Sequence, residues 1–108
     1  MTTQDNVLRR LSAILAADVV GYSRLIAADE TGTLARFKQI RTDLIDPTIA
    51  QFQGRIVGTA GDSLLVEFTN ALAAVECAIA CQSELSRVDA PEPEDRRMLF
   101  RMGSIWAM

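Results

Sequence analysis

The sequence predicts a single α+β domain with a ferredoxin-like core, an antiparallel sheet that carries helices on one face. Two observations support this. The chain has 108 residues, of which 49% are hydrophobic, enough for one hydrophobic core and too few for two. Along it, apolar runs and helical periodicity follow the order strand, helix, strand, strand, helix, strand. We divide the chain into a polar N-terminal segment, residues 1–10, and the domain, residues 11–108.

The first half of the domain predicts a strand and a long helical region. Residues 11–20, LSAILAADVV, form a near-continuous apolar run of the kind found in buried strands. Over residues 23–52 apolar side chains recur every three or four positions, which predicts helix, with a break or cap near residues 29–33. Pro47 predicts a kink or a new start, with Asp46 as the new cap. The side chains expected to face the sheet are Leu34, Phe37, Ile40, Leu44, Ile45, Ile49 and Phe52.

The second half predicts a hairpin, a helix and a last strand. Residues 55–58 and 63–68 are two strand candidates joined by a short turn. A helix capped by Asn70 is expected to run to about Arg87, and an exposed acidic loop, DAPEPED, follows it. Residues 98–106 then suit a last strand. The side chains of this helix expected to face inward are Leu72, Val75, Ile79 and Leu85.

Composition and charge exclude several functions. The net charge is -3, which argues against binding to nucleic acid or to an anionic membrane. The chain has no His, which excludes Ser-His-Asp and Cys-His catalysis and zinc held by His. Cys77 and Cys81 lie one helical turn apart, and we interpret them as small apolar core residues. Because the sequence shows neither a signal peptide nor a membrane span, we expect a soluble, cytoplasmic protein.

Two carboxylates occupy positions that folding alone does not explain. Asp18 lies inside the apolar first strand, and Asp62 follows Gly61 in the hairpin turn. The predicted topology places both at one rim of the sheet. Carboxylates suit Mg²⁺ or Mn²⁺, and two such ions suit phosphoryl transfer. Gly21 would let the chain turn sharply after the strand, so that the amides of residues 20–23 could hold a polyphosphate.

Both aspartates also have a purely structural interpretation. Asp18 could cap the helix that begins near Ser23. Gly61 and Asp62 could form an ordinary tight turn, because Gly-Asp pairs are common in turns. The spacing of these residues leaves both interpretations open.

Three segments carry a resemblance to a known family. They are ILAADVVGYSRL, then DETGTLARFKQIRTDLIDP, and then GRIVGTAGDSLLVEF with its Gly-Asp turn. In this order and at this spacing they resemble the catalytic domain of class III adenylate and guanylate cyclases, the middle segment resembling the bacterial branch. The resemblance covers nearly the whole chain up to about Gly103.

The resemblance implies a reaction and its site. Asp18, Asp62 and the backbone carbonyl of Val19 would bind two Mg²⁺ or Mn²⁺ ions. The implied substrate is ATP, with GTP as the alternative; the ribose 3′-hydroxyl attacks the α-phosphate, and a cyclic nucleotide and pyrophosphate result. Family members act as dimers, which implies a homodimer or pairing with another cyclase domain. The residues expected to lie against the nucleotide are Val20, Gly21, Tyr22, Ser23 and Gly61.

The sequence departs from the family pattern in two places. Gly58 stands where a lysine usually reads the adenine base. After Gly103 the tail SIWAM leaves the pattern, so we expect a C-terminally truncated domain that is weak or inactive alone; a non-catalytic module that pairs with a complete cyclase chain is the alternative. A small basic group, Arg96, Arg97 and Arg101, could meet phosphate or form a solvated charge cluster.

Overall fold

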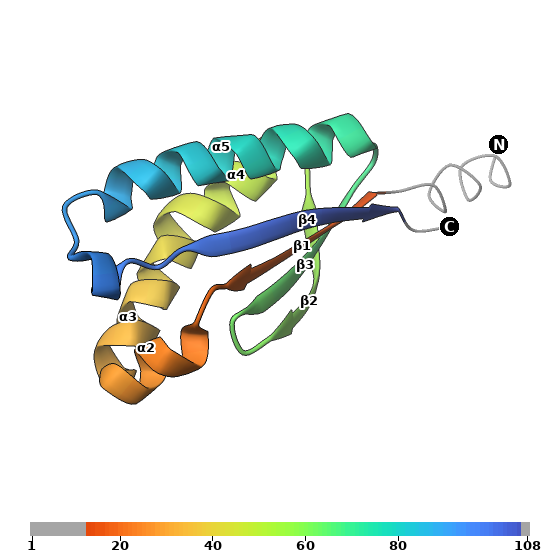
Figure 1. Ribbon diagram of the computed structural model, residues 1–108. Coiled ribbons are helices and arrows are strands. Elements are labelled where there is room, and N and C mark those ends of the chain that lie inside the picture. The colour runs from red at the N-terminus through yellow and green to blue at the C-terminus, as the bar shows by residue number, and fades with distance from the viewer. Residues whose placement is uncertain (1–12, 107–108) are drawn as a thin grey trace, which may run out of the picture.

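A four-stranded antiparallel sheet with helices on one face forms the fold, as the sequence predicts (Figure 1). The computed structural model describes residues 13–106, and the side chains of residues 13–103. The strands are β1 (Ala13–Val19), β2 (Arg55–Ala60), β3 (Ser63–Phe68) and β4 (Phe100–Trp106). The helices are α2 (Tyr22–Ala28), α3 (Glu30–Ile40), α4 (Asp46–Gln51) and α5 (Ala71–Asp89). The order β2-β3-β1-β4 places β1 beside the hairpin, which confirms the ferredoxin-like prediction.

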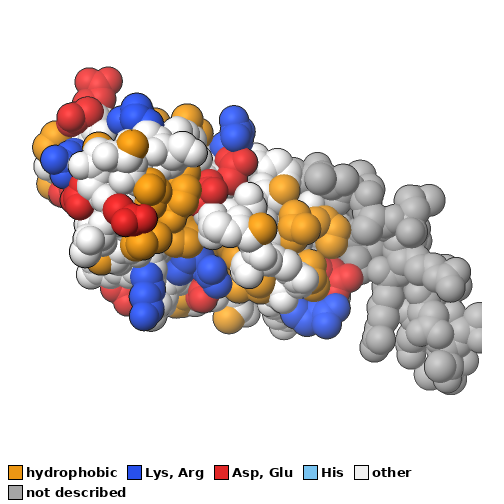
Figure 2. All heavy atoms as spheres, turned by 90° about the horizontal axis from the view of Figure 1, so that it is seen from below, with side chains coloured by type: hydrophobic (Ala, Val, Ile, Leu, Met, Phe, Trp, Pro, Cys, Tyr) orange, Lys and Arg blue, Asp and Glu red, His pale blue; other side chains and the backbone are white. Residues whose placement is uncertain are grey.

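One face of the sheet forms the hydrophobic core, and the other is accessible to solvent. Successive side chains of a strand point to opposite faces, so alternate residues share one face. The buried residues of β1 and β3 are Ala13, Leu15, Ala17, Val19, Leu64, Val66 and Phe68. Asp18 and Leu65 lie on the opposite, open face. Seen from the side away from α5, the molecule shows hydrophobic side chains interspersed with charged ones (Figure 2).

The helical region before the hairpin stays helical through Pro47. Arg41–Ile45 form a π-helical turn, in which the Asp46 amide donates to the Arg41 carbonyl. This wider turn directly precedes Pro47, which has no amide hydrogen to donate to an α-helical ladder. The prediction that Asp46 caps a new helix is wrong, because its carboxylate accepts hydrogen bonds from Arg41 at 2.8 and 3.3 Å instead. Asp29 does cap α3, through the Gly32 amide at 3.0 Å.

Four side chains that we expected to face the sheet are exposed instead. They are Leu34, Leu72, Val75 and Ile79, with exposed fractions of 49%, 68%, 45% and 64%. The buried residues of α5 are Ala74, Cys77, Cys81, Leu85 and Asp89. Most of these are small, so the helix approaches the sheet closely and turns its larger aliphatic side chains outward. The prediction that Cys77 and Cys81 are core residues is confirmed, since both are buried and unpaired by any disulfide.

The acidic segment after α5 is more ordered than predicted. Asp89 is the last residue of α5 and is only 3% exposed, so its assignment to an exposed loop is wrong. Arg97 donates to the carbonyls of Ala90 and Glu92 at 3.3 and 3.1 Å, which fastens the connection to β4. Within residues 13–106, none of the helices has the length and apolar character needed to cross a bilayer.

Candidate functional site

The hairpin turn brings Asp62 to the end of β1. Gly61 has φ of 59°, a left-handed conformation that side chains disfavour, and it allows the tight reversal between β2 and β3. Asp62 Oδ2 then accepts a hydrogen bond from the Val19 amide at 2.8 Å. Val19 directly follows Asp18, so the two aspartates predicted to bind metal lie at the same rim of the sheet. The carboxylate of Asp62 therefore connects the hairpin to β1 through the Val19 amide.

Asp18 is held by Arg101 from the neighbouring strand. The two residues are register partners in the antiparallel pairing of β1 with β4. Arg101 donates through Nε to Oδ1 and through Nη2 to Oδ2, both at 3.0 Å, so both carboxylate oxygens are engaged. The Asp18 side chain is 34% exposed, and the Arg101 side chain is 70% exposed. Hydrogen bonding to Asp18 raises the pKa of Arg101, and the charges of Asp18 and Asp62 raise this pKa further.

A shallow cavity on the open face contains this ion pair. Its volume is about 260 Å³. Its lining residues come from β1, β3 and β4: Ala16, Ala17, Asp18, Ser63, Leu64, Leu65, Arg101 and Gly103. A Cβ placed on Gly103 would meet nothing within 4 Å, so this wall of the cavity is open. The open face therefore offers space for a ligand directly beside Asp18.

The segment predicted to hold phosphate begins α2. Gly21 adopts φ of 66° at the start of this helix, which confirms the sharp turn. The helix has no side-chain cap, so Asp18 is not its capping residue. The Val20 amide donates to the Leu99 carbonyl at 2.8 Å and is therefore engaged within the fold. The ring of Tyr22 packs edge-on against Phe37, with centroids 5.9 Å apart.

The backbone at Gly58 leaves room for a side chain. This residue follows an irregularity in the pairing of β2 with β3, between Ile56 and Gly58. A Cβ at this position would lie 3.6 Å from the nearest atom of Leu65, an ordinary van der Waals distance. The missing lysine side chain therefore reflects the sequence and not a steric restriction.

The predicted basic group does not exist as a cluster. Arg96 lies 3.8 Å from Asp29, Arg97 bonds to loop carbonyls, and Arg101 bonds to Asp18. Sequence reasoning named Arg101 as a basic residue but missed its pairing with Asp18. This pairing follows from the register of β1 with β4, which brings together two residues 83 positions apart in the sequence. Local sequence patterns do not reveal this register.

The donor set at the rim fits hard divalent cations. Asp18 and Asp62 supply carboxylate oxygens, which Mg²⁺ and Mn²⁺ prefer over nitrogen and sulfur ligands. A guanidinium group already lies against one of these carboxylates, which shows that the rim accommodates positive charge. Among the described residues no group of three or more His, Cys, Asp and Glu side chains is placed to bind a metal. Any ion here would need ligands besides these two carboxylates, such as backbone, water or phosphate oxygens.

Comparisons with known proteins found relatives by sequence and by structure. No protein-family model matches the chain. Putative adenylate cyclase 3 of Rhizobium meliloti is 43% identical over 104 residues, which are 93% of this chain and 17% of that protein. A crystal structure of an adenylate/guanylate cyclase/hydrolase from Silicibacter pomeroyi is 45% identical, with a TM-score of 0.84 over 91% of this chain and 57% of that one. The chain belongs to the class III adenylate/guanylate cyclase family.

One more distant structure shares the fold, and one more distant curated protein shares part of the sequence. The structure of a bacterial light-regulated adenylyl cyclase matches 89% of the chain with a TM-score of 0.78 at 16% identity. Serine/threonine-protein kinase pkn2 of Myxococcus xanthus is 29% identical over 89 residues, 82% of this chain and 11% of that protein. This chain thus spans a small part of the curated relatives it matches and 57% of the Silicibacter pomeroyi chain.

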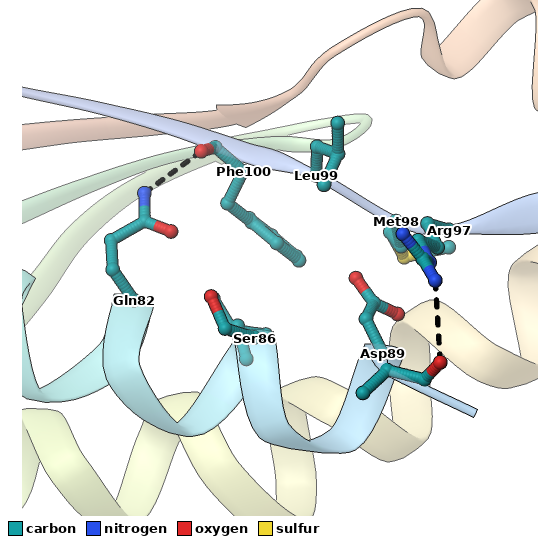
Figure 3. Close-up of a pocket in the computed structure, with 9 residues that line it drawn as sticks. Gln82, Ser86, Asp89, Arg97, Met98, Leu99 and Phe100 are labelled. Carbon is teal, nitrogen blue, oxygen red and sulfur yellow. Dashed lines mark hydrogen bonds between the residues drawn. The ribbon is translucent and has the colours of Figure 1, made fainter. Parts of the chain in front are cut away.

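A second cavity of the cyclase domain lies between α5 and the start of β4 (Figure 3). Its volume is about 230 Å³, and Ser86 and Asp89 point from α5 toward the strand. Gln82 Nε2 donates to the Phe100 carbonyl at 2.8 Å. The Asp89 side chain is 5% exposed and accepts a hydrogen bond from Arg36 Nη2 at 2.7 Å. This ion pair links α3 to the end of α5, so we interpret it as a structural contact.

The two thiols lie on the buried face of α5. Cys77 and Cys81 are 0% and 1% exposed. Hydrogen bonding to Cys81 and burial raise the pKa of the Cys77 thiol, so that this thiol stays protonated at neutral pH. Neither residue belongs to the rim that carries Asp18 and Asp62.

Proposed function

We propose that this cyclase domain binds ATP together with two Mg²⁺ or Mn²⁺ ions and serves the formation of cyclic AMP and pyrophosphate. The observation that carries the proposal is the contact of Asp62 Oδ2 with the Val19 amide. It brings the hairpin aspartate to the residue next to Asp18, at a rim that borders an open cavity. Membership of the cyclase family supports the same assignment.

Each residue of the rim has a separate role in this proposal. Asp18, Asp62 and the Val19 carbonyl would hold the ions, which would promote deprotonation of the attacking ribose hydroxyl and neutralise phosphate charge. The amides of Gly21, Tyr22 and Ser23 would lie against the triphosphate. Because the Val20 amide already donates to the Leu99 carbonyl, Val20 would contribute mainly its position in the turn. The left-handed turn at Gly61 positions Asp62.

Recognition of the base is weaker here than in family members with lysine at the position of Gly58. Glycine offers no side-chain donor, and one missing buried hydrogen bond costs about 1–3 kcal/mol of discrimination. ATP is proposed as the substrate because the relative from Rhizobium meliloti is named an adenylate cyclase. GTP is expected to bind nearly as well. Restoring the lysine, Gly58→Lys, should raise the preference for an ATP analogue over a GTP analogue.

A titration tests the nucleotide site. Isothermal titration calorimetry with Mn²⁺ and a non-hydrolysable ATP analogue would compare the wild type with the double variant Asp18→Asn, Asp62→Asn. The proposal expects binding by the wild type and loss of binding in the double variant. Asp43→Asn is a matched control, because Asp43 is an exposed acid of the helical region away from the rim. Equal binding by wild type and double variant would contradict the proposal.

A second candidate function is pairing with another cyclase domain, either a second copy or a complete cyclase chain. Val20, Val57 and Leu65 are 44%, 47% and 43% exposed, so apolar area is accessible on the open face and its rim. Mixing the chain with a complete cyclase and measuring cyclic AMP tests pairing. Stimulation or dominant inhibition supports this function, and an unchanged rate contradicts it.

A further inference from the structure

The ion pair on the open face has no structural task that would explain its geometry. Arg101 is 70% exposed and comes from β4, and its partner Asp18 comes from the middle of the sheet. Backbone pairing already fixes the two strands, with register partners from Ala13↔Trp106 to Val19↔Phe100. An exposed ion pair adds little stability to such a ladder. The contact therefore acts mainly on the charge and accessibility of Asp18.

The guanidinium of Arg101 lies against both oxygens of Asp18. Both carboxylate oxygens accept a hydrogen bond from the guanidinium, each at 3.0 Å, in the bidentate arrangement that is strongest for this pair of groups. A divalent cation that coordinates Asp18 must bind one of these oxygens next to the positively charged guanidinium, so the two cations repel each other. Asp62 differs, because its contact to the fold uses Oδ2 and a backbone amide that cannot move away. Asp18 is thus held by a side chain that can rotate away, and Asp62 by a backbone amide that is fixed in the sheet.

The geometry points to Arg101 as a counter-cation that competes with the divalent cation for Asp18 and releases Asp18 when the metal binds. This inference rests on the proposed function, since it assumes that Asp18 is a metal ligand. Arg101 has space to leave, because it lines the same 260 Å³ cavity as Gly103, whose Cβ position is empty. It also remains charged throughout, so the site exchanges one cation for another. Arg101 is then a positioning residue that sets metal affinity.

The main experiment measures binding of Mn²⁺ alone, by titration calorimetry, to the wild-type chain and to Arg101→Gln. Loss of the competing guanidinium should tighten Mn²⁺ binding by about fivefold, the upper value for an exposed ion pair. Arg101→Lys retains the charge but loses the bidentate contact, so its affinity should lie between those of the other two. Unchanged or weaker binding by Arg101→Gln would overturn the inference.

Arg55→Gln is the matched control. Arg55 forms a second cross-strand ion pair, with Glu67 at 2.6 Å, and its removal changes the net charge by the same amount. Glu67 pairs with Ile14, four residues before Asp18 on β1, or roughly 13 Å away at the usual strand rise. At physiological salt this distance exceeds the Debye length, so Mn²⁺ binding should stay at the wild-type value. Tightening equal to that of Arg101→Gln would reduce the effect to net charge and overturn the inference.

A spectroscopic measurement follows the guanidinium itself. The Nε–H signal of Arg101 in a ¹⁵N spectrum is identified by its loss in Arg101→Gln. Saturation with Mg²⁺, which is diamagnetic, should shift this signal as its bond to Asp18 breaks, and the Arg55 signal should not move. A static Arg101 signal at saturation would overturn the inference. If Asp18→Asn leaves Mn²⁺ affinity unchanged, the proposed function fails as well, which distinguishes that failure from a failure of Arg101 alone.

Discussion

Gly54, between α4 and β2, is a position where one added methyl group would collide with the hydrophobic core. A Cβ here would lie 2.6 Å from Phe68 Cε2 and 2.9 Å from Ile49 Cγ2. Both neighbours are core residues, at 1% and 4% exposed, so neither can yield into solvent. Carbon atoms pack favourably at about 3.5–4.0 Å, so the ring of Phe68 must move by about 1 Å. Overpacking of this kind costs about 1–3 kcal/mol.

The net effect of Gly54→Ala is smaller than the overpacking alone. Replacing glycine restricts the unfolded chain and returns about 0.4–1 kcal/mol. We therefore expect a loss of roughly 1–2 kcal/mol in the free energy of unfolding, measured by urea denaturation followed by circular dichroism. Gly103→Ala is the control, because its Cβ would meet nothing within 4 Å and its stability should stay near the wild-type value. An unfolding midpoint of Gly54→Ala equal to that of the wild type would refute this reasoning.

Three further predictions concern contacts away from the rim. Asn70→Ala removes the oxygen that accepts the Ala73 amide at 2.8 Å, so urea denaturation should show a loss of about 1 kcal/mol, and no loss would contradict this capping role. Asp89→Ala leaves Arg36 without its carboxylate, and the same assay should show a loss of about 1–3 kcal/mol; a loss below that of Asn70→Ala would contradict a structural role. Cys77 and Cys81 should react with a thiol reagent only after urea unfolding, and rapid labelling of the folded chain would refute their burial.

The fold was predictable because its strands and helices leave strong local patterns. The apolar run that contains β1, the residues of β3 and the caps Asp29 and Asn70 all lie where the sequence places them. The orientation of α5 was not predictable in this way. Both sides of that helix carry apolar residues, and the larger side chains, such as Leu72, suggested the wrong inner face. Close packing on the sheet favours the small residues, and only the tertiary structure shows this preference.

The position of the two carboxylates at one rim was predictable from the sequence, and their bonding partners were not. Asp18 was recognisable as a charged residue inside an apolar strand, and Asp62 as the acid that follows Gly61 in the hairpin turn. The hairpin does bring Asp62 to Val19. The pairing of Asp18 with Arg101 depends on how β1 and β4 align, which a single sequence does not specify. The same strand alignment engages the Val20 amide with Leu99. Long-range register therefore decides which groups of the site remain available to a ligand.

In the proposed function, Asp18 and Asp62 together form a divalent-cation site at the rim of the sheet. The most direct measurement is paramagnetic broadening of backbone amide signals in a ¹⁵N-labelled chain on addition of substoichiometric Mn²⁺. The amides of Val19, Asp62 and Arg101 should broaden first, and the double variant Asp18→Asn, Asp62→Asn should abolish the effect. Broadening centred instead on the acidic segment around Glu94, with the signals at the rim unchanged, would contradict the proposed site.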